Sequence, residues 1–139
     1  MNPPVDHLEI AVALPVWGTF TYRAPSDLRS AAVSGRRVLV PFGPRRVTGY
    51  VLGVSGEIPD SDIKDILDVL DEERLFTEEM IPFFRWTADY YIHPIGEVIK
   101  GALPGGLNLY EFNQYAITDT ACQLPDQATL TPMERAVLD

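Results

Sequence analysis

Residues 37–54, RVLVPFGPRRVTGYVLGV, decide the fold of this 139-residue chain. Residues 37–40 alternate polar and apolar side chains, which predicts a β-strand. Residues 41–44 have the chemistry of a turn, because proline fixes φ and Gly43 has no Cβ. Residues 47–54 then form the returning strand. The stretch therefore predicts two strands joined by a turn rich in Pro and Gly.

Further strands are predicted on both sides of this stretch. Residues 7–14 (HLEIAVAL) alternate partly and are rich in Val and Ile, so they indicate a strand that ends at Pro15. Residues 19–22 follow Gly18 and indicate a short strand. Residues 63–70 (IKDILDVL) fit both a helical and an extended period, and their alternation leads us to favour a strand.

The pattern becomes helical from Thr77 onward. Thr77 can cap a helix whose first turn carries two glutamates, which suit the positive end of the helix dipole. The helix should end before Pro94, since the residue before a proline avoids the α region. One helical face would carry Met80, Phe83, Phe84, Thr87 and Tyr91. We expect residues 86–94 (WTADYYIHP) to be helix core rather than a stacking platform, and residues 95–102 to form a second helix.

The predicted fold class is α+β, with a domain boundary near residue 106. Residues 1–106 form a small, β-rich, barrel-like unit closed by two C-terminal helices. Residues 131–134 (TPME) are a capping box with proline at the first helical position, which is a specific signal for the start of a helix. A helix as short as the remaining sequence allows is not stable alone. We therefore expect residues 107–139 to be the truncated start of a second domain.

The composition is that of a globular protein. Hydrophobic residues make up 46% of the chain, which is too many for a disordered one. No apolar run approaches the roughly 20 residues that span a bilayer, and the first residues lack the features of a signal peptide. Cys122 is the one cysteine, so neither an internal disulfide nor a CxxC zinc site is expected. These features favour a cytoplasmic protein.

The charge is unevenly distributed along the chain. The net charge of −9 argues against a simple nucleic-acid binder, which should be basic. However, residues 23–46 carry six arginines against Asp27, and residues 57–79 carry ten acids against Lys64 and Arg74. A chain polarised in this way can present one basic face. The alternative is that both segments are ordinary solvated surface.

The motifs of common enzyme classes are absent from the sequence. There is neither a GxxxxGK[ST] phosphate loop nor a GxGxxG, so a nucleotide site has no support. The acidic box at residues 71–74 (DEER) is interpreted as a solvated turn, because no phosphate loop accompanies it. His7 and His93 lack ligand spacing to any cysteine, and no GxSxG elbow is present. The sequence therefore predicts a non-catalytic protein without a metal site.

Three clusters of residues are candidates for binding. The first is Phe20–Tyr22, whose two rings lie on one face of a strand, where a nucleobase could stack. The second is the turn at residues 41–46, where Gly43 allows close approach and two arginines, Arg45 and Arg46, can pair with phosphate. The third is Lys64, a base among many acids. The alternatives are core aromatics, a charged hairpin tip and a lysine that neutralises its neighbours.

These segments together resemble a known family. FTY, RVLVPFG, GYVLGV, IKDILDVLD and WTADYYIHPIGEVIKGALP match, in order and spacing, the amino-terminal region of the primosomal replication-restart helicases, the primosomal protein N′ (PriA) family. The resemblance covers residues of about 8–104, and the last of these blocks is the most specific.

The resemblance implies a DNA-binding role in replication restart. The family's amino-terminal domain binds DNA at forks and captures the 3′-OH end of the nascent leading strand. A winged-helix domain follows, whose start would be residues 107–139. The whole enzyme is an ATP-dependent 3′→5′ DNA helicase with magnesium and zinc, so those cofactors would belong to parts absent here. The alternative function is a protein-interaction domain, whose acidic residues 57–79 dock on single-strand-binding protein or primosome partners.

The resemblance also implies a DNA 3′-end pocket formed by Phe20, Thr21, Tyr22, Gly43 and Lys64. Arg45 and Arg46 would make further phosphate contacts. The middle position of the FTY motif is commonly Asp in the family, where its carboxylate accepts hydrogen bonds from the terminal nucleotide. Thr21 has no charge, and a neutral hydrogen bond is weaker than a charge-assisted one. The expectation is therefore weaker end binding, or a carboxylate supplied by another residue.

Overall fold

The predicted pair of strands lies at the centre of the fold. The computed structural model describes residues 7–56, 62–105 and 107. β3 (Arg37–Phe42) and β4 (Arg45–Val54) pair antiparallel from Arg37↔Tyr50 to Phe42↔Arg45. Both strands are longer than predicted, because pairing continues into the Pro-Phe-Gly-Pro segment.

Pro41 lies inside β3 and not in the turn that the sequence suggested. β5 (Asp68–Val69) pairs only with Val38 and Leu39 of β3, so β3 is an unpaired edge beyond them. A proline, which cannot donate a ladder hydrogen bond, is tolerated at such an edge. The turn is therefore reduced to Gly43 and Pro44.

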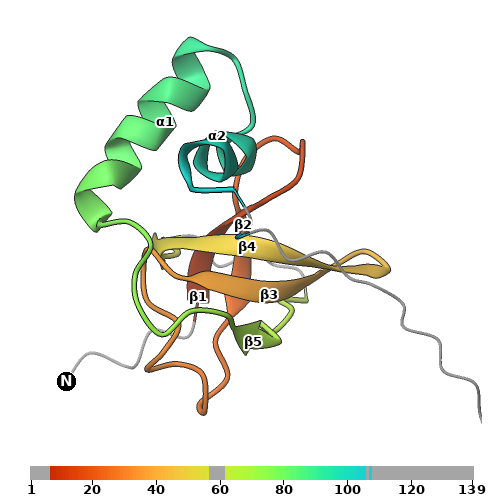
Figure 1. The fold of residues 1–139 in the computed structure, drawn as a ribbon. Coiled ribbons are helices and arrows are strands. Elements are labelled where there is room, and N and C mark those ends of the chain that lie inside the picture. Colours follow the sequence, from red (N-terminus) through yellow and green to blue (C-terminus); the bar gives the residue numbers. More distant parts are fainter. Residues whose placement is uncertain (1–6, 57–61, 106, 108–139) are drawn as a thin grey trace, which may run out of the picture.

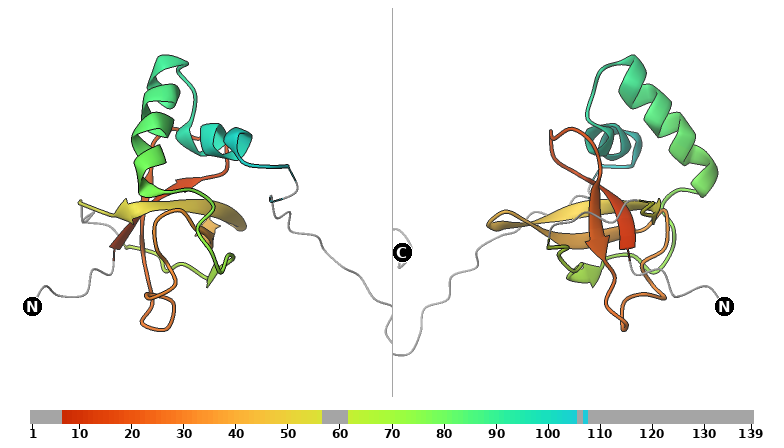
Figure 2. Two further views of the ribbon diagram at one scale, coloured as in Figure 1. Left: turned by 60° about the vertical axis from the view of Figure 1, so that its left-hand side comes forward. Right: turned by 180° about the vertical axis from the view of Figure 1, so that it is seen from behind.

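The other strands extend the sheet on both sides. β1 (His7–Val12) pairs with β4, and β2 (Phe20–Arg23) pairs with β1, giving the order β2-β1-β4-β3-β5. All four pairings are antiparallel. Figures 1 and 2 show both helices on one side of this sheet. The predicted α+β class is confirmed.

A closed barrel is not seen. The predicted strand over residues 63–70 is reduced to β5 and a single parallel bridge between Arg23 and Asp65. The reason is that neighbouring backbone groups bond to different strands. The Ile66 N–H donates to the Arg23 carbonyl at 2.9 Å, whereas the Leu67 N–H donates to the Leu39 carbonyl at 2.8 Å. A segment shared between two partners cannot form a continuous ladder with either one.

The helical region begins with a 3₁₀ turn, η1 (Glu78–Met80), and continues as α1 (Ile81–Tyr90). Thr77 is the N-cap of η1 as predicted, but its side chain makes no capping hydrogen bond. Ser34 instead donates to the Glu78 carboxylate at 2.6 Å, which ties this turn to the loop before β3. The second helix, α2 (Ile95–Ala102), has the predicted bounds.

Two hydrophobic clusters lie on opposite faces of the sheet. One fills the side away from the helices and is built from Leu8, Ile10, Val12, Tyr22, Val38, Val40, Val51 and Ile66. The other joins the sheet to the helices through Ala11, Tyr50, Leu52, Phe76, Phe84, Ile95 and Ile99. Successive residues of a strand point to opposite faces, so the consecutive apolar residues of β1 and β4 bury both faces and give this small domain two layers of core.

Residues 107–139 lie almost entirely outside the described part of the chain. The predicted winged-helix start, the strand at 115–117, the capping box at 131–134 and Cys122 all fall there.

Candidate nucleic-acid interface

The five residues expected in a DNA 3′-end pocket line one cavity. Its volume is about 300 Å³, and it is lined by Phe20, Thr21, Tyr22, Pro41, Phe42, Gly43, Asp62 and Lys64. Three separate segments contribute: strand β2, the end of β3 with the following turn, and the segment before β5. Pro41 and Phe42 also line the cavity and belong to the candidate turn at residues 41–46, whereas Asp62 is a lining residue that the sequence prediction did not include.

The aromatic residues form one side of this cavity. Phe20 and Phe42 meet edge to face, with ring centroids 5.2 Å apart. Tyr22 is buried, its hydroxyl donates to the Pro41 carbonyl at 2.9 Å, and burial raises the pKa of its phenol. Tyr22 is therefore a core residue as well as a lining residue. Phe20, which is only half-buried, is the ring more available to a ligand.

Gly43 supplies an open backbone wall at the hairpin tip. Its φ of +59° lies in the left-handed region, where a side chain is disfavoured. A Cβ placed there would meet no atom within 4 Å, so the glycine is required for its conformation and not for space. The backbone at the tip is therefore accessible to a bound strand.

Thr21 borders the cavity but its hydroxyl is engaged elsewhere. Successive residues of a strand point to opposite faces, so the Thr21 side chain leaves β2 on the face opposite Phe20 and Tyr22. Its Oγ1 lies 2.9 Å from Ser55 Oγ, within hydrogen-bonding distance. The Thr21 hydroxyl is thus held by Ser55.

Two charged residues line the cavity, Lys64 and Asp62, and both are exposed. The backbone at Lys64 is fixed, because its carbonyl accepts the Arg23 N–H at 2.9 Å. The segment that carries both charges is thereby attached to the edge strand β2. The cavity can offer a cation and an anion to a ligand from the same segment.

Arg45 and Arg46 are exposed at the start of β4 but do not line the cavity. The pairing register of β3 and β4 places these two arginines on opposite faces of the sheet. Arg45 pairs with Phe42 and Arg46 with Pro41, and residues directly opposite each other in a sheet share a face. Arg45 is therefore on the face of Phe42, beside the cavity, and Arg46 is on the other face.

The basic and acidic segments pair with each other in the fold. Arg23 Nε lies 2.6 Å from Asp65 Oδ1, and Arg37 Nη2 lies 2.6 Å from Asp71 Oδ1. Burial opposes ionisation of Asp71, but the hydrogen bonds and charge of Arg37 outweigh it, so the pKa of this carboxyl is lowered. Two of the six arginines counted toward a basic face are thus used in ion pairs with the acidic segment.

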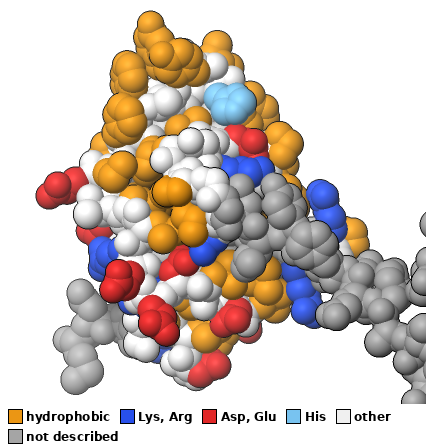
Figure 3. All heavy atoms as spheres, viewed as in Figure 1, with side chains coloured by type: hydrophobic (Ala, Val, Ile, Leu, Met, Phe, Trp, Pro, Cys, Tyr) orange, Lys and Arg blue, Asp and Glu red, His pale blue; other side chains and the backbone are white. Residues whose placement is uncertain are grey.

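A row of exposed aromatic rings runs along α1. The prediction that residues 86–94 are helix core is wrong for the aromatic residues among them, which are exposed. The rings are Phe83, Trp86, Tyr90 and Tyr91, called the aromatic ladder below. Trp86 stacks on Tyr90 with centroids 5.0 Å apart and planes 19° apart, although their exposed fractions are 56% and 65%. Figure 3 shows hydrophobic side chains gathered along this helix.

The buried face of α1 was predicted wrongly because apolar residues cover more than one face of this helix. The buried residues are Ile81, Phe84 and Ala88, at the helical spacing i, i+3 and i+7. The small Ala88 is the signal that could have identified this face, since a small side chain permits close packing. Choosing the larger aromatic residues instead shifted the prediction by one position.

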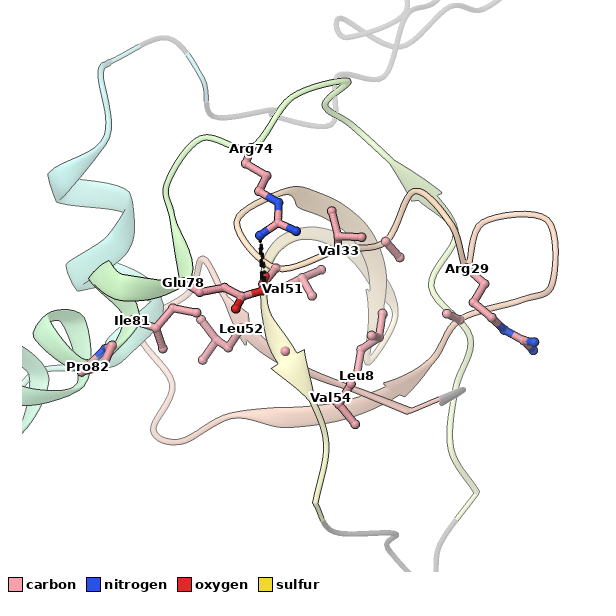
Figure 4. Close-up of a pocket in the computed structure, with 14 residues that line it drawn as sticks. Leu8, Arg29, Val33, Val51, Leu52, Val54, Arg74, Glu78, Ile81 and Pro82 are labelled. Carbon is pink, nitrogen blue, oxygen red and sulfur yellow. Dashed lines mark hydrogen bonds and ion pairs between the residues drawn. The ribbon is translucent and has the colours of Figure 1, made fainter. Parts of the chain in front are cut away.

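A larger cavity of about 630 Å³ shares no lining residue with the candidate DNA 3′-end cavity (Figure 4). Its polar lining includes Arg29, Ser34, Arg74 and Glu78, and Arg74 pairs with Glu78 at 3.3 Å. None of the residues predicted to bind DNA lines it. The candidate interface is therefore the smaller cavity, at which the predicted residues converge.

Within residues 7–56, 62–105 and 107, no three His, Cys, Asp or Glu side chains lie together so as to hold a metal ion. The helices described there are too short or too polar to cross a bilayer.

Comparison with known proteins identifies the family. The family described as the PriA 3′ DNA-binding domain (3′BD) matches residues 9–104. The replication restart protein PriA of Treponema pallidum is 34% identical over 103 residues, which are 70% of this chain and 16% of that protein. PriA of Haemophilus influenzae is 34% identical over 99 residues, 70% of this chain and 13% of that protein. PriA of Bacillus subtilis is 31% identical over 90 residues, 63% of this chain and 11% of that protein.

The chain thus spans less than a fifth of the length of these relatives. The family match extends from β1 to just beyond α2 and includes the sheet, both helices and the cavity. The chain belongs to the PriA 3′ DNA-binding domain family, whose members bind DNA in replication restart.

Proposed function

We propose that this chain binds DNA at replication forks by holding the 3′-OH end of the nascent leading strand in the cavity beside β2. The observation that carries the proposal is the convergence of Phe20, Thr21, Tyr22, Gly43 and Lys64 on one site from three segments. These residues supply a ring, an open backbone wall and a cation. A terminal nucleotide presents the matching groups: a base, a sugar and a phosphate.

The size of the cavity favours an end over an internal stretch of DNA. The cavity of about 300 Å³ is at the small end of the roughly 300–1,000 Å³ typical of ligand pockets, so it suits one nucleotide. A base can stack against Phe20, a contact worth about 1–3 kcal/mol. Stacking does not depend on the identity of the base, so the site should accept all four nucleotides.

The phosphate contacts would come from Lys64 and the arginines at the start of β4. Such contacts position a strand without reading its sequence. They are few, and the net charge of −9 repels DNA at longer range. Binding should therefore be modest and should weaken as salt is raised.

The test is fluorescence anisotropy with tailed and forked DNA that ends in 3′-OH or 3′-phosphate. We expect tighter binding to the 3′-OH end and a loss of binding in Lys64→Ala on all sequences alike. Lys100→Ala is the matched control, because Lys100 lies on α2, pairs with Glu97 and does not line the cavity. Equal affinity of the unaltered protein for the two ends would contradict end recognition.

In this proposal the chain is a non-catalytic targeting module of a longer replication-restart helicase. ATP, Mg²⁺ and Zn²⁺ would act in parts of that protein outside the matched region. The place of action would be the cytoplasm, at the nucleoid, where replication forks lie.

A second candidate function is docking of a partner protein, such as single-strand-binding protein or a primosome component. The observation that favours it is the aromatic ladder, not the acidic segment first considered. Exposed clusters of aromatic side chains mark interaction sites, because aromatic residues are enriched at protein interfaces. Asp65 and Asp71 of the acidic segment are instead paired within the fold.

A further inference from the structure

Asp62 is the anionic residue of the candidate DNA-end cavity. It and Lys64 stand two positions apart in the segment before β5, and both line the cavity. Within the described part of the chain, neither takes part in an ion pair. Their opposite charges are therefore available to a ligand, although the surface around them carries many acids.

Other acceptors near the cavity are already engaged. The Thr21 hydroxyl lies 2.9 Å from Ser55 Oγ, on the far face of β2. Asp65, three residues beyond Asp62, pairs with Arg23 at 2.6 Å and does not line the cavity. The Pro41 carbonyl accepts the Tyr22 hydroxyl. Asp62 is consequently the strongest acceptor that the lining leaves available.

We propose that the Asp62 carboxylate accepts a hydrogen bond from the terminal 3′-hydroxyl of bound DNA, while Lys64 contacts the phosphate before the terminal nucleotide. The inference rests on the proposed function, since it assumes that the cavity holds a DNA end. A hydroxyl that donates to a carboxylate forms a short, charge-assisted bond, stronger than one to a neutral acceptor. A terminal phosphate would bring two like charges together and be repelled.

Asp62 would thus select the chemical form of the end, and Lys64 would hold the strand. The two roles predict different mutant behaviour. Loss of the lysine weakens binding to every kind of end. Loss of the carboxylate charge alters only the discrimination between ends, because the stacking and phosphate contacts remain.

The experiment compares Asp62→Asn with the unaltered chain on three otherwise identical strands, ending in 3′-OH, 3′-phosphate or 3′-deoxy. The asparagine is nearly isosteric, and the position is exposed, so folding should be unaffected. We expect the preference for 3′-OH over 3′-phosphate to fall by roughly tenfold or more, since bonds to charged groups are the stronger ones. Affinity for the 3′-deoxy end should be the same in both proteins.

Glu79→Gln is the matched control, since it removes one exposed negative charge at η1, away from the cavity lining. Its preference between ends should equal that of the unaltered chain. If the unaltered chain prefers 3′-OH and Asp62→Asn keeps the same preference, the role of Asp62 is overturned while the end-binding function stands. If the unaltered chain binds 3′-OH and 3′-phosphate ends equally well, and Lys64→Ala has the same affinity for DNA as the unaltered chain, both proposals fail together.

Discussion

Arg37 and Asp71 form a bidentate ion pair in which each side chain is only 10% exposed. Arg37 Nε and Nη2 donate to the carboxylate at 3.0 and 2.6 Å, and the Arg37 backbone N–H donates to it at 2.9 Å. The pair joins the start of β3 to the chain that leaves β5. The strand pairing of β5 extends over only two residues, and this side-chain contact adds to backbone hydrogen bonds such as that from the Leu70 N–H to the Arg37 carbonyl at 2.9 Å.

Removing one partner of this pair should destabilise the domain severely. In Asp71→Ala the guanidinium stays buried without its carboxylate, which typically costs about 3–5 kcal/mol. Urea unfolding followed by circular dichroism measures the difference. The double variant Arg37→Met with Asp71→Leu should be closer in stability to the unaltered chain, because no buried charge is left unpaired. A loss below about 1 kcal/mol in Asp71→Ala would mean that the pair behaves like a surface ion pair.

The same pair should make stability depend on acid pH. The pKa of Asp71 is lowered in the folded chain: burial opposes ionisation, but the Arg37 hydrogen bonds outweigh it. Its contribution is thus present above the unfolded pKa of about 3.9 and is lost as pH falls through the lower folded value. The measurement is the urea midpoint between pH 6 and pH 2, for the unaltered chain and Asp71→Asn. The midpoint of the variant should fall less steeply at the acid end.

Tyr50 should make stability fall at alkaline pH. It is paired with Arg37 across β3 and β4, and burial raises the pKa of its phenol from 10.0 to about 12. The neutral form is therefore favoured in the folded chain, so this contribution is intact below pH 10 and lost as pH rises toward 12. Two pKa units correspond to about 2–3 kcal/mol. Thermal unfolding from pH 8 to pH 12 should show a steeper loss in the unaltered chain than in Tyr50→Phe.

Gly96 allows α2 to pack directly on β1. A Cβ at this position would overlap the Val12 backbone carbonyl, and rigid backbone cannot move aside cheaply. Gly96→Ala should therefore cost about 3 kcal/mol, at the upper end of overpacking losses. Gly101→Ala is a control on the same helix, because a Cβ there meets nothing within 4 Å. It should be neutral or stabilise the domain by about 0.5–1 kcal/mol, since alanine favours helix. Similar losses in both variants would exclude this packing argument.

The sequence predicted most of the fold where local chemistry dominates. The alternation in β1 and β4 and the proline before α2 mark elements whose type does not depend on distant contacts. Residues 63–70 were predicted less well, because their pairing depends on two strands that lie far away in sequence. Their exchange of partners between Arg23 and Leu39 is a property of the assembled sheet.

The candidate DNA 3′-end cavity was likewise predicted only in part. Its predicted residues came from a family resemblance and from chemistry, and the fold brings them to one place. Asp62 was not distinguished from the other acids of its segment, since nothing local sets it apart from Asp65. The fold separates the two carboxylates, because Asp62 lines the cavity whereas Asp65 pairs with Arg23.

The strand register separates the two arginines at the hairpin tip. Arg45 lies opposite Phe42 on the cavity face, and Arg46 lies opposite Pro41 on the other face. Arg45→Ala should weaken DNA binding and lower the salt dependence by about one phosphate contact, a slope change of roughly 0.9. Arg46→Ala, its matched control, should have a smaller effect. Anisotropy titrations at several salt concentrations measure both quantities, and equal losses would show that the register does not govern the contacts.

The aromatic ladder should be required for a partner protein and dispensable for folding. Trp86 is 56% exposed and stacks on Tyr90, whereas Phe84 on the same helix is fully buried and packs against Phe76. Trp86→Ala should thus change the free energy of unfolding by less than about 1 kcal/mol, and Phe84→Ala should cost about 3–5 kcal/mol. In a pull-down with purified single-strand-binding protein, Trp86→Ala should lose the interaction but keep its affinity for a 3′-OH end. If Trp86→Ala binds both ligands normally, the ladder does not dock that partner. If it loses DNA instead, the rings belong to the nucleic-acid interface.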